Sequence, residues 1–225
     1  MNKNNLLIFS ILILIFYGCA PSEKLVFRST ESDAQIWVNG QKAGIGSTDE
    51  YVLKENHCIH VKVEKIGFIT YENKFCKYDK KYKSDPNIKL IELIRDDAYD
   101  ASIQSDQANK DFIAEVNKKY TIDEAWKIIH QTLTNYFEIE YADKETGYLK
   151  TTWQSMSFRT KTVRTRAIVK QYNLTPLQYQ VRIVSEIALK ADQSVKNDEK
   201  FMSWDRILRK YDGVINEFQT RLSAK

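Results

Sequence analysis

The stretch that decides the fold of the N-terminal half spans residues 57 to 64 and reads His57-Cys58-Ile59-His60-Val61-Lys62-Val63-Glu64. Every second residue from Ile59 to Val63 is apolar, and this period of two predicts a half-buried β-strand. Gly67 follows closely, and residues 68–76 form a second run that is typical of a strand. The stretch therefore predicts an antiparallel hairpin that turns around Gly67.

Two cysteines, Cys58 and Cys76, lie at equal distances on either side of Gly67. Opposite positions on a hairpin place Cβ atoms about 4.5–5.5 Å apart, slightly more than the separation of about 3.5–4.5 Å in a disulfide. A disulfide is therefore one interpretation, and a pair of buried thiols is the other. Neither cysteine belongs to a Cys-x-x-Cys motif, so redox catalysis is not expected.

Further runs on both sides of this hairpin extend the β pattern. Residues 25–28, 34–38 and 88–94 are each typical of a strand. Asn39-Gly40 predicts a type I′ turn, because both central residues of that turn need positive φ. The sequence therefore predicts a small antiparallel β-domain over residues 25–94.

This β-domain resembles the PEGA family. The family pattern has an alanine that enters a strand, an Asp-Gly or Asn-Gly hairpin, a second glycine and a strand that ends in Gly-Tyr. The matching positions are Ala34, Asn39-Gly40, Gly44 and Gly67-Phe68. The family's naming tetrapeptide stands here as Glu31-Ser32-Asp33-Ala34 and keeps only its alanine. The resemblance implies a non-catalytic interaction module of exported and envelope proteins.

The N-terminal segment predicts export. After the single cation Lys3, residues 6–17 form an uncharged apolar run. As a helix this run would rise about 18 Å at 1.5 Å per residue, whereas a membrane span needs roughly 20 residues. Residues 1–18 are therefore expected to be a signal peptide.

Phe16-Tyr17-Gly18-Cys19 resembles the lipobox of bacterial lipoproteins. The resemblance implies that Cys19 carries diacylglycerol and begins the mature chain, with residues 19–24 linking it to the β-domain. A signal anchor with an incidental cysteine is the alternative. Ala20 stands where an aspartate would resemble an inner-membrane retention signal, so we expect anchoring at the outer membrane, facing the periplasm. Lipidation of Cys19 would leave Cys58 and Cys76 as a pair in an oxidising compartment.

Residues 95–110 are polar and predict a linker between two domains. A calcium loop is the alternative interpretation of its four aspartates, Asp96, Asp97, Asp100 and Asp106. The Asp-x-Asp-x-Asp spacing with a turn glycine is absent, so a solvated linker is favoured. We expect no metal site and no cofactor.

Residues 111–225 predict a second domain of strands and helices. Residues 112–116 alternate as a strand, and Thr121 and Glu124 form a capping box that starts a helix reaching about Tyr136. Two hairpins are expected over residues 138–153 and 163–189. In the first hairpin one face is expected to combine Ile139, Tyr141, Leu149, Thr151 and Trp153.

A final helix is predicted from about Asp198, because apolar residues recur there at spacings of three and four. These residues are Phe201, Trp204, Leu208, Tyr211, Ile215, Phe218 and Leu222. The order of elements resembles the helix-grip domains of the outer-membrane-assembly lipoprotein C group, with the likeness carried by Ala125-Trp126, Asp143…Gly147 and Trp153. The predicted fold class is α+β: a small antiparallel β-domain, then an antiparallel sheet packed by two helices.

Motifs for catalysis are lacking. The three histidines, His57, His60 and His130, are not spaced to ligate one ion. No nucleophile elbow, phosphate-binding loop or His-Glu-x-x-His occurs. The net charge of +4, from 34 basic and 30 acidic residues, is too small to indicate a nucleic-acid-binding protein. We therefore expect no catalytic residues and no enzyme.

A basic run from Arg159 to Arg166 contains the candidate binding surface. Arg164, Arg166 and Lys170 would line one face of a strand and would suit anionic headgroups, lipopolysaccharide or an acidic partner. A solvated face that pairs across the hairpin with Glu186 is the alternative. Nucleic acid is not expected, because the export signal places the protein outside the cytoplasm.

The sequence thus predicts a non-enzymatic lipoprotein that acts as a scaffold or interaction module and binds an envelope protein or a glycan. A lipid- or glycolipid-binding protein is the alternative, with a cavity between sheet and final helix lined by Trp126, Trp153 and Trp204. A filled core would count against that alternative. An envelope hydrolase with an unrecognised site is a third hypothesis.

Overall fold

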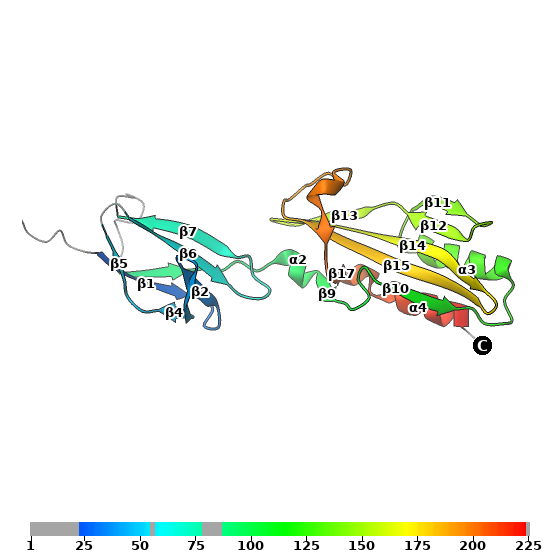
Figure 1. Cartoon of the computed structure of the whole chain (residues 1–225), viewed down its shortest axis with the longest axis horizontal. Coiled ribbons are helices and arrows are strands. Elements are labelled where there is room, and N and C mark those ends of the chain that lie inside the picture. Colours follow the sequence, from blue (N-terminus) through cyan, green and yellow to red (C-terminus); the bar gives the residue numbers. More distant parts are fainter. Residues whose placement is uncertain (1–22, 55–56, 78–86, 224–225) are drawn as a thin grey trace, which may run out of the picture. The chain divides into compact units, whose positions relative to one another are not determined.

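The computed structural model describes residues 23–54, 57–77 and 87–223. The predicted signal peptide and Cys19 lie outside these residues. The chain divides into two compact units, residues 1–95 and 96–225, and the fold is mixed α+β with mostly antiparallel sheets (Figure 1).

The first unit is built from strands that follow the sheet order β5-β1-β4-β3-β2-β6-β7, with β8 beside β1. Their bounds are β1 (Glu23–Ser29), β2 (Gln35–Val38), β3 (Gln41–Ile45), β4 (Ser47–Thr48), β5 (Tyr51–Leu53), β6 (Cys58–Glu64), β7 (Tyr71–Cys76) and β8 (Ile88–Ile91). Buried residues from β1, β2, β6 and β7 share one hydrophobic core, among them Phe27, Ile36, Val61 and Phe75. One face of the sheet therefore encloses the core of this unit.

The hairpin predicted around Gly67 is confirmed. β6 and β7 pair antiparallel from Cys58↔Cys76 to Val63↔Tyr71, and Gly67 has φ of 81°. The structure joins Cys58 and Cys76 by a disulfide with Sγ atoms 2.01 Å apart. The pleat explains the register, because Ile59, Val61 and Val63 all reach the core from one face of β6.

The Asn39-Gly40 turn is also confirmed. Asn39 and Gly40 have φ of 52° and 80°, as the type I′ turn requires, and the turn joins β2 to β3. The side chain of Asn39 also accepts a hydrogen bond of 2.9 Å from the backbone N–H of His60. The turn is therefore tied to the neighbouring strand β6.

The expectation of an antiparallel domain is wrong for β8, which runs parallel to β1 with Val26↔Ile88 and Ser29↔Ile91 in register. A parallel pair needs a long crossover connection rather than a tight hairpin, and the chain between β1 and β8 is long, because the strands β2 to β7 lie between them in the sequence. Strand β8 also ends at Ile91 rather than at Ile94. Beyond the strand, the carbonyl of Ile94 accepts a hydrogen bond from the N–H of Ile69.

The second unit holds a sheet in the order β10-β15-β14-β12-β11, with β13 beside β14 and β16 beside β15, and a separate pair β17-β9. The strands are β9 (Ser102–Gln104), β10 (Asp111–Glu115), β11 (Ile139–Asp143), β12 (Tyr148–Thr151), β13 (Gln154–Ser157), β14 (Thr162–Leu174), β15 (Leu177–Ala188), β16 (Met202–Ser203) and β17 (Arg206–Leu208). The helices are α2 (Asp97–Asp100), α3 (Ile122–Thr134) and α4 (Gly213–Ser223).

Helices α3 and α4 pack on one face of this sheet. Their fully buried residues, including Ile129, Leu133 and Phe218, belong to the same core as Val169 and Ile183 from β14 and β15. The predicted capping box is confirmed: the Thr121 hydroxyl accepts from the Glu124 N–H at 3.2 Å, and the Glu124 carboxylate accepts from the Thr121 N–H at 2.8 Å. Helix α3 therefore begins where the sequence indicates.

The expectation of a plain linker over residues 95–110 is wrong. Asp96 caps α2 by accepting from the N–H groups of Ala98 and Tyr99, and its carboxylate pairs with Lys161. Strand β9 then pairs with β17, far along the chain. Two of the four aspartates, Asp96 and Asp97, therefore start a helix that belongs to the second unit.

The long final helix expected from Asp198 is also wrong in its first half, because α4 begins only at Gly213. Residues 202–203 extend the sheet beside β15, and residues 206–208 pair with β9. Asn109 supports this path, because its side-chain amide donates to the carbonyls of Ser185 and Trp204. Long-range partners thus override a helical spacing that contains weak helix formers such as Ser203 and Asp205.

The face expected to be shared in the first hairpin is divided between both sides of the sheet. Leu149 and Thr151 point into the core, but a β-bulge between Ile139 and Tyr141 turns Tyr141 to the opposite face. Trp153 follows the end of β12 and contacts arginines on that opposite face. The period of two fails where a strand is interrupted.

Candidate binding face of the second unit

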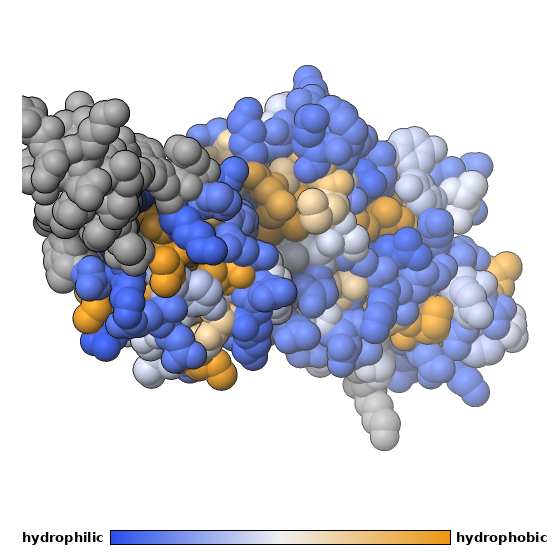
Figure 2. Space-filling model, turned by 60° about the vertical axis from the view of Figure 1, so that its left-hand side comes forward, coloured by the Kyte–Doolittle hydropathy of each residue, from blue (hydrophilic) through white to orange (hydrophobic). Residues whose placement is uncertain are grey.

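One face of the second unit's sheet points away from α3 and α4, and we call it the open face. Val163, Ala167 and Val169 of β14 are buried in the core. The intervening residues of the strand, from Arg164 to Lys170, therefore alternate onto the open face. In the view of Figure 2 the surface is mainly hydrophilic, and apolar side chains emerge in separate patches on both units.

Arg164 does not belong to an exposed basic surface, which corrects the sequence-based expectation. Arg164 is 2% exposed, and Nε and Nη2 of its guanidinium lie 2.8 and 2.6 Å from the Glu186 carboxylate. It also donates to the Val195 carbonyl and, at 2.7 Å, to Asp198. The chain after β15 folds back over β14 and brings Val195 and Asp198 to this arginine. The guanidinium of Arg164 is therefore occupied by hydrogen bonds within the fold.

Aromatic rings and guanidinium groups alternate beside Arg164. Its guanidinium carbon lies 4.0 Å from the ring centroid of Phe201 and 4.1 Å from that of Trp153. The guanidinium carbon of Arg166 lies 4.0 Å from the same Trp153 ring. The stack therefore runs Phe201, Arg164, Trp153, Arg166, and each such contact is favourable by about 0.5–2 kcal/mol.

Arg166 ends this stack and differs from Arg164 in its partners. Its Nε is buried and has no hydrogen-bond partner, and its guanidinium forms no ion pair with the residues that the structure describes. A buried donor left without a partner costs about 1–3 kcal/mol. Stacking on Trp153 holds the planar group in one orientation, so an anion could be bound without first ordering the side chain.

Lys170 lies four residues further along β14, about 13 Å from Arg166 at the usual rise of a strand. It is exposed and forms no ion pair within the described part of the chain. Between them lies Ile168, opposite Arg182 of β15. The open face therefore presents two cations that form no ion pair with the described residues, separated by one apolar side chain, and the charge of Lys170 also contributes to lowering the pKa of Asp111.

Arg182 is a third cation on the open face, and it already has an ion-pair partner, Asp111. It binds Asp111 through two hydrogen bonds of 2.6 and 2.5 Å. This guanidinium holds the pKa of the Asp111 carboxyl below its usual value, and the Asp111 carboxylate raises the pKa of Arg182. Asp111, Arg182, Ile168, Lys170 and Gln180 line a cavity of about 30 Å³. That volume suits one or two water-sized groups rather than an acyl chain.

The three tryptophans expected to line one cavity are not brought together. Trp126 and Trp204 pack against the core, whereas Trp153 lies on the open face between two arginines. The space between α3, α4 and the sheet is filled by fully buried side chains such as Leu133 and Phe218. This arrangement counts against the lipid-binding alternative.

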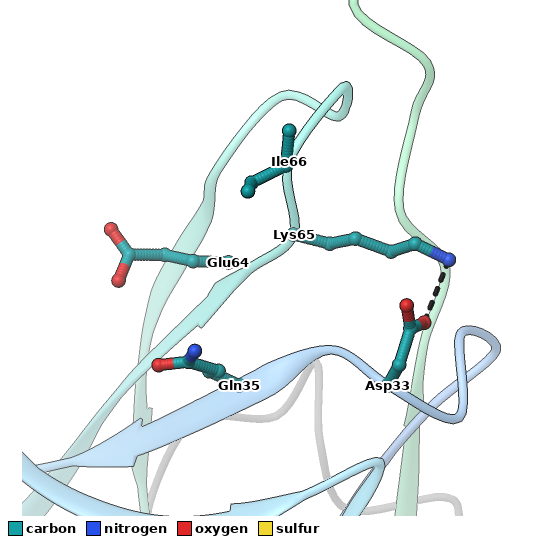
Figure 3. A pocket seen from close by; sticks show the side chains of 5 residues that line it. All are labelled: Asp33, Gln35, Glu64, Lys65 and Ile66. Carbon is teal, nitrogen blue, oxygen red and sulfur yellow. Dashed lines mark ion pairs between the residues drawn. The ribbon is translucent and has the colours of Figure 1, made fainter.

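The first unit has an open depression of about 420 Å³, lined by Asp33, Gln35, Glu64, Lys65 and Ile66. Figure 3 shows Lys65 extended toward Asp33, while the Glu64 side chain points the other way. Lys65 pairs with Asp33 at 2.7 Å and with Glu31 at 2.5 Å, so its charge is already balanced. The depression offers less unpaired charge than the open face.

The histidines are distributed over both units. His57 and His60 belong to the first unit, where His60 lies 3.2 Å from Glu72, and His130 lies on α3 in the second. Among the residues that the structure describes, no group of three or more His, Cys, Asp or Glu side chains could hold a metal ion.

Part of this site was missed by sequence reasoning. Arg166 and Lys170 were expected, but the stacking role of Trp153 and Phe201 was not, because both rings were assigned to the core. Arg182 could have been found because it alternates with the apolar residues Val181 and Ile183 on β15, which places it on the same face as Gln180. No helix in the described ranges is both long and apolar enough to cross a membrane. No protein-family model and no curated protein matches this chain.

Proposed function

We propose that this chain is a non-enzymatic lipoprotein of the cell envelope. It is anchored at Cys19 to the outer membrane, faces the periplasm and acts as a scaffold or interaction module. Its second unit binds an acidic envelope protein or glycan through Arg166 and Lys170. Its two units have PEGA-like and helix-grip-like folds.

The anchoring part of the proposal is supported by the apolar run over residues 6–17 and by the lipobox-like Gly18-Cys19 that follows. The disulfide between Cys58 and Cys76 is consistent with an oxidising compartment outside the cytoplasm. Two or more acyl chains on Cys19 would hold the protein durably, whereas one chain gives only reversible binding.

The observation that carries the binding part is the buried, unpartnered Nε of Arg166. Buried polar groups nearly always have a partner, so an exception calls for a ligand or water at that place. A carboxylate or phosphate at the guanidinium would pair with a planar cation that Trp153 holds in one orientation. The other groups on the open face are the aromatic ring of Trp153, the ammonium of Lys170 and the amide of Gln180, and these groups suit the binding of an acidic partner.

A photo-crosslinking amino acid at Ile168, between the two cations, tests the proposal in intact envelopes. We expect a specific adduct with the unaltered chain, and its loss when Arg166→Gln and Lys170→Gln are combined. Lys190→Gln combined with Lys196→Gln is the matched control, because it removes the same charge from exposed positions beyond β15.

Proteinase K and glycosidase digestion of the adduct then distinguish a protein partner from a glycan. If the adduct persists at full yield in the Arg166 and Lys170 variant, the open face is not the binding surface and the binding part of the proposal is wrong.

A further inference from the structure

A second surface lies on the first unit, on the outer side of the strands β8, β1 and β5, and we call it the β8–β1–β5 face. Its apolar side chains are Val26, Val52, Ile88 and Leu90, and its basic side chains are Lys24 and Arg28. These residues belong to the first unit, so this surface is separate from the open face of the second unit.

The strand registers show that these side chains share one face. Leu25 and Phe27 of β1 point into the core, so the residues between and beside them point outward. Val52 lies opposite Lys24, Ile88 lies beside Val26, and Leu90 lies beside Arg28. Neighbouring positions of paired strands lie on the same side of a sheet, and the six side chains therefore form one continuous patch.

Three of the apolar side chains on this face are substantially exposed. Val52 is 47% exposed, Ile88 43% and Leu90 66%. Single exposed apolar residues are common, but several gathered on one face mark a surface that contacts a protein or a membrane.

The charges on this face favour an anionic neighbour. Lys24 pairs with Glu50 at 2.9 Å, with both side chains more than half exposed. Arg28, beside Leu90, forms no ion pair with any residue that the structure describes. An unpaired arginine next to exposed aliphatic side chains suits the phosphates of a lipid surface, where each basic residue adds about 1 kcal/mol of attraction.

The length of chain before β1 identifies the neighbour. Strand β1 begins at Glu23, four residues after Cys19, and four residues span at most about 14 Å. The headgroup layer on each side of a bilayer takes up about 5–8 Å of that length. A compact unit of this size has a radius of gyration of about 11 Å, so the tether is too short to hold it clear of the membrane.

We propose that the β8–β1–β5 face rests on the phospholipid headgroups of the leaflet that holds the anchor. The apolar side chains near the start of β1 contact the boundary between headgroups and acyl chains, and Arg28 pairs with phosphate. This inference rests on the proposed lipidation of Cys19. It assigns the first unit a membrane-contact role.

The test uses the full-length lipidated protein in vesicles of phosphatidylethanolamine and phosphatidylglycerol. An environment-sensitive fluorophore is attached at Leu90→Cys, and at Lys42→Cys as the matched control. Lys42 is exposed in the same unit but lies on β3, opposite Trp37 of β2. We expect quenching by lipids with a shallow doxyl group to be several-fold stronger at position 90 than at position 42. Arg28→Gln should reduce the quenching at position 90 more strongly in these vesicles than in phosphatidylcholine vesicles, where choline balances each phosphate and the surface has no net negative charge.

Flotation of the vesicles separates this inference from the proposed anchor. A chain that floats with the vesicles but shows equal or no lipid quenching at the two positions is anchored, and the inference is overturned. A position 90 shielded from both doxyl lipid and a water-soluble quencher is covered by protein, which also overturns it. A chain that does not float overturns the anchor and this inference together.

Discussion

The two units of this chain are stabilised in different ways. The first unit has the smaller core, and a disulfide between Cys58 and Cys76 links β6 to β7 at one edge of its sheet. The second unit has the larger core, and Arg164 holds a distant segment against its sheet by hydrogen bonds and aromatic stacking. The comparison shows that a small β-domain relies on a local covalent link, whereas the larger domain relies on contacts between residues far apart in sequence.

Removing the buried arginine should produce the largest effect. We expect Arg164→Ala to destabilise the second unit by about 3–5 kcal/mol, because Glu186 is left partly buried without its partner and the Trp153–Phe201 stack is interrupted. The first unit should unfold as before. Thermal or urea unfolding, with fluorescence and circular dichroism as probes, measures both transitions.

Arg159→Ala is the control for Arg164, because Arg159 is exposed at the other end of the same basic run. A destabilisation by Arg159→Ala equal to that by Arg164→Ala would mean that total charge, rather than the buried contacts, decides the stability of the unit.

Removing the disulfide should produce the next largest loss of stability, and this loss should fall on the first unit. Combining Cys58→Ser with Cys76→Ser frees a loop of sequence separation 18, and loop-closure entropy gives a loss of about 3 kcal/mol. We expect the first unit alone to melt earlier, and reduction of the unaltered protein to reproduce the shift. A shift of the second unit instead would contradict the division of the chain at Arg95 and Asp96.

The capping box tests a local device within the second unit. Thr121→Ala removes the hydroxyl that accepts the Glu124 N–H, and we expect a loss of about 1 kcal/mol in the unfolding of this unit. Thr70→Ala, at an exposed position of the first unit, should leave both transitions unchanged. Urea titration of the two variants measures the difference.

The smallest expected effect depends on pH. Arg182 holds the pKa of Asp111 below its usual value, so this pair stabilises the second unit above the unfolded pKa of about 4 and is lost as the pH falls through the folded pKa. Arg182→Gln should therefore reduce stability at neutral pH and flatten its decline in acid. Because both side chains are about one-third or more exposed, the change should be small. Equal acid sensitivity of the variant and the unaltered chain would contradict the role of this pair.

Much of the fold could be predicted where local sequence decides it. The Asn39-Gly40 turn, the hairpin around Gly67 and the Thr121 capping box depend on residues close together in the chain, and all three are confirmed. Residues 201–211 were wrongly assigned to a helix because their path depends on distant partners, β9 and β15. Apolar residues spaced three and four apart indicate a helix only when nothing else competes for the backbone. In residues 201–211 the pairing with β9 and β15 determines the backbone conformation instead.

The candidate site follows the same division. Alternation along β14 predicted that Arg164, Arg166 and Lys170 share one face, but it contained no information on the segment that returns over Arg164. The structure therefore separates an arginine that stabilises the fold from one whose buried donor remains unpartnered. Nothing in the local sequence distinguishes the two, because both arginines alternate with residues that point into the core.

The proposed anchor can be tested most directly by mass spectrometry of the N-terminal peptide of the mature protein from its native envelope. We expect a chain that begins at Cys19 and carries a diacylglyceryl group, with no peptide from residues 1–18 attached. A mature chain that retains those residues, or that begins elsewhere without lipid, would contradict the anchor, the compartment and the membrane contact of the first unit.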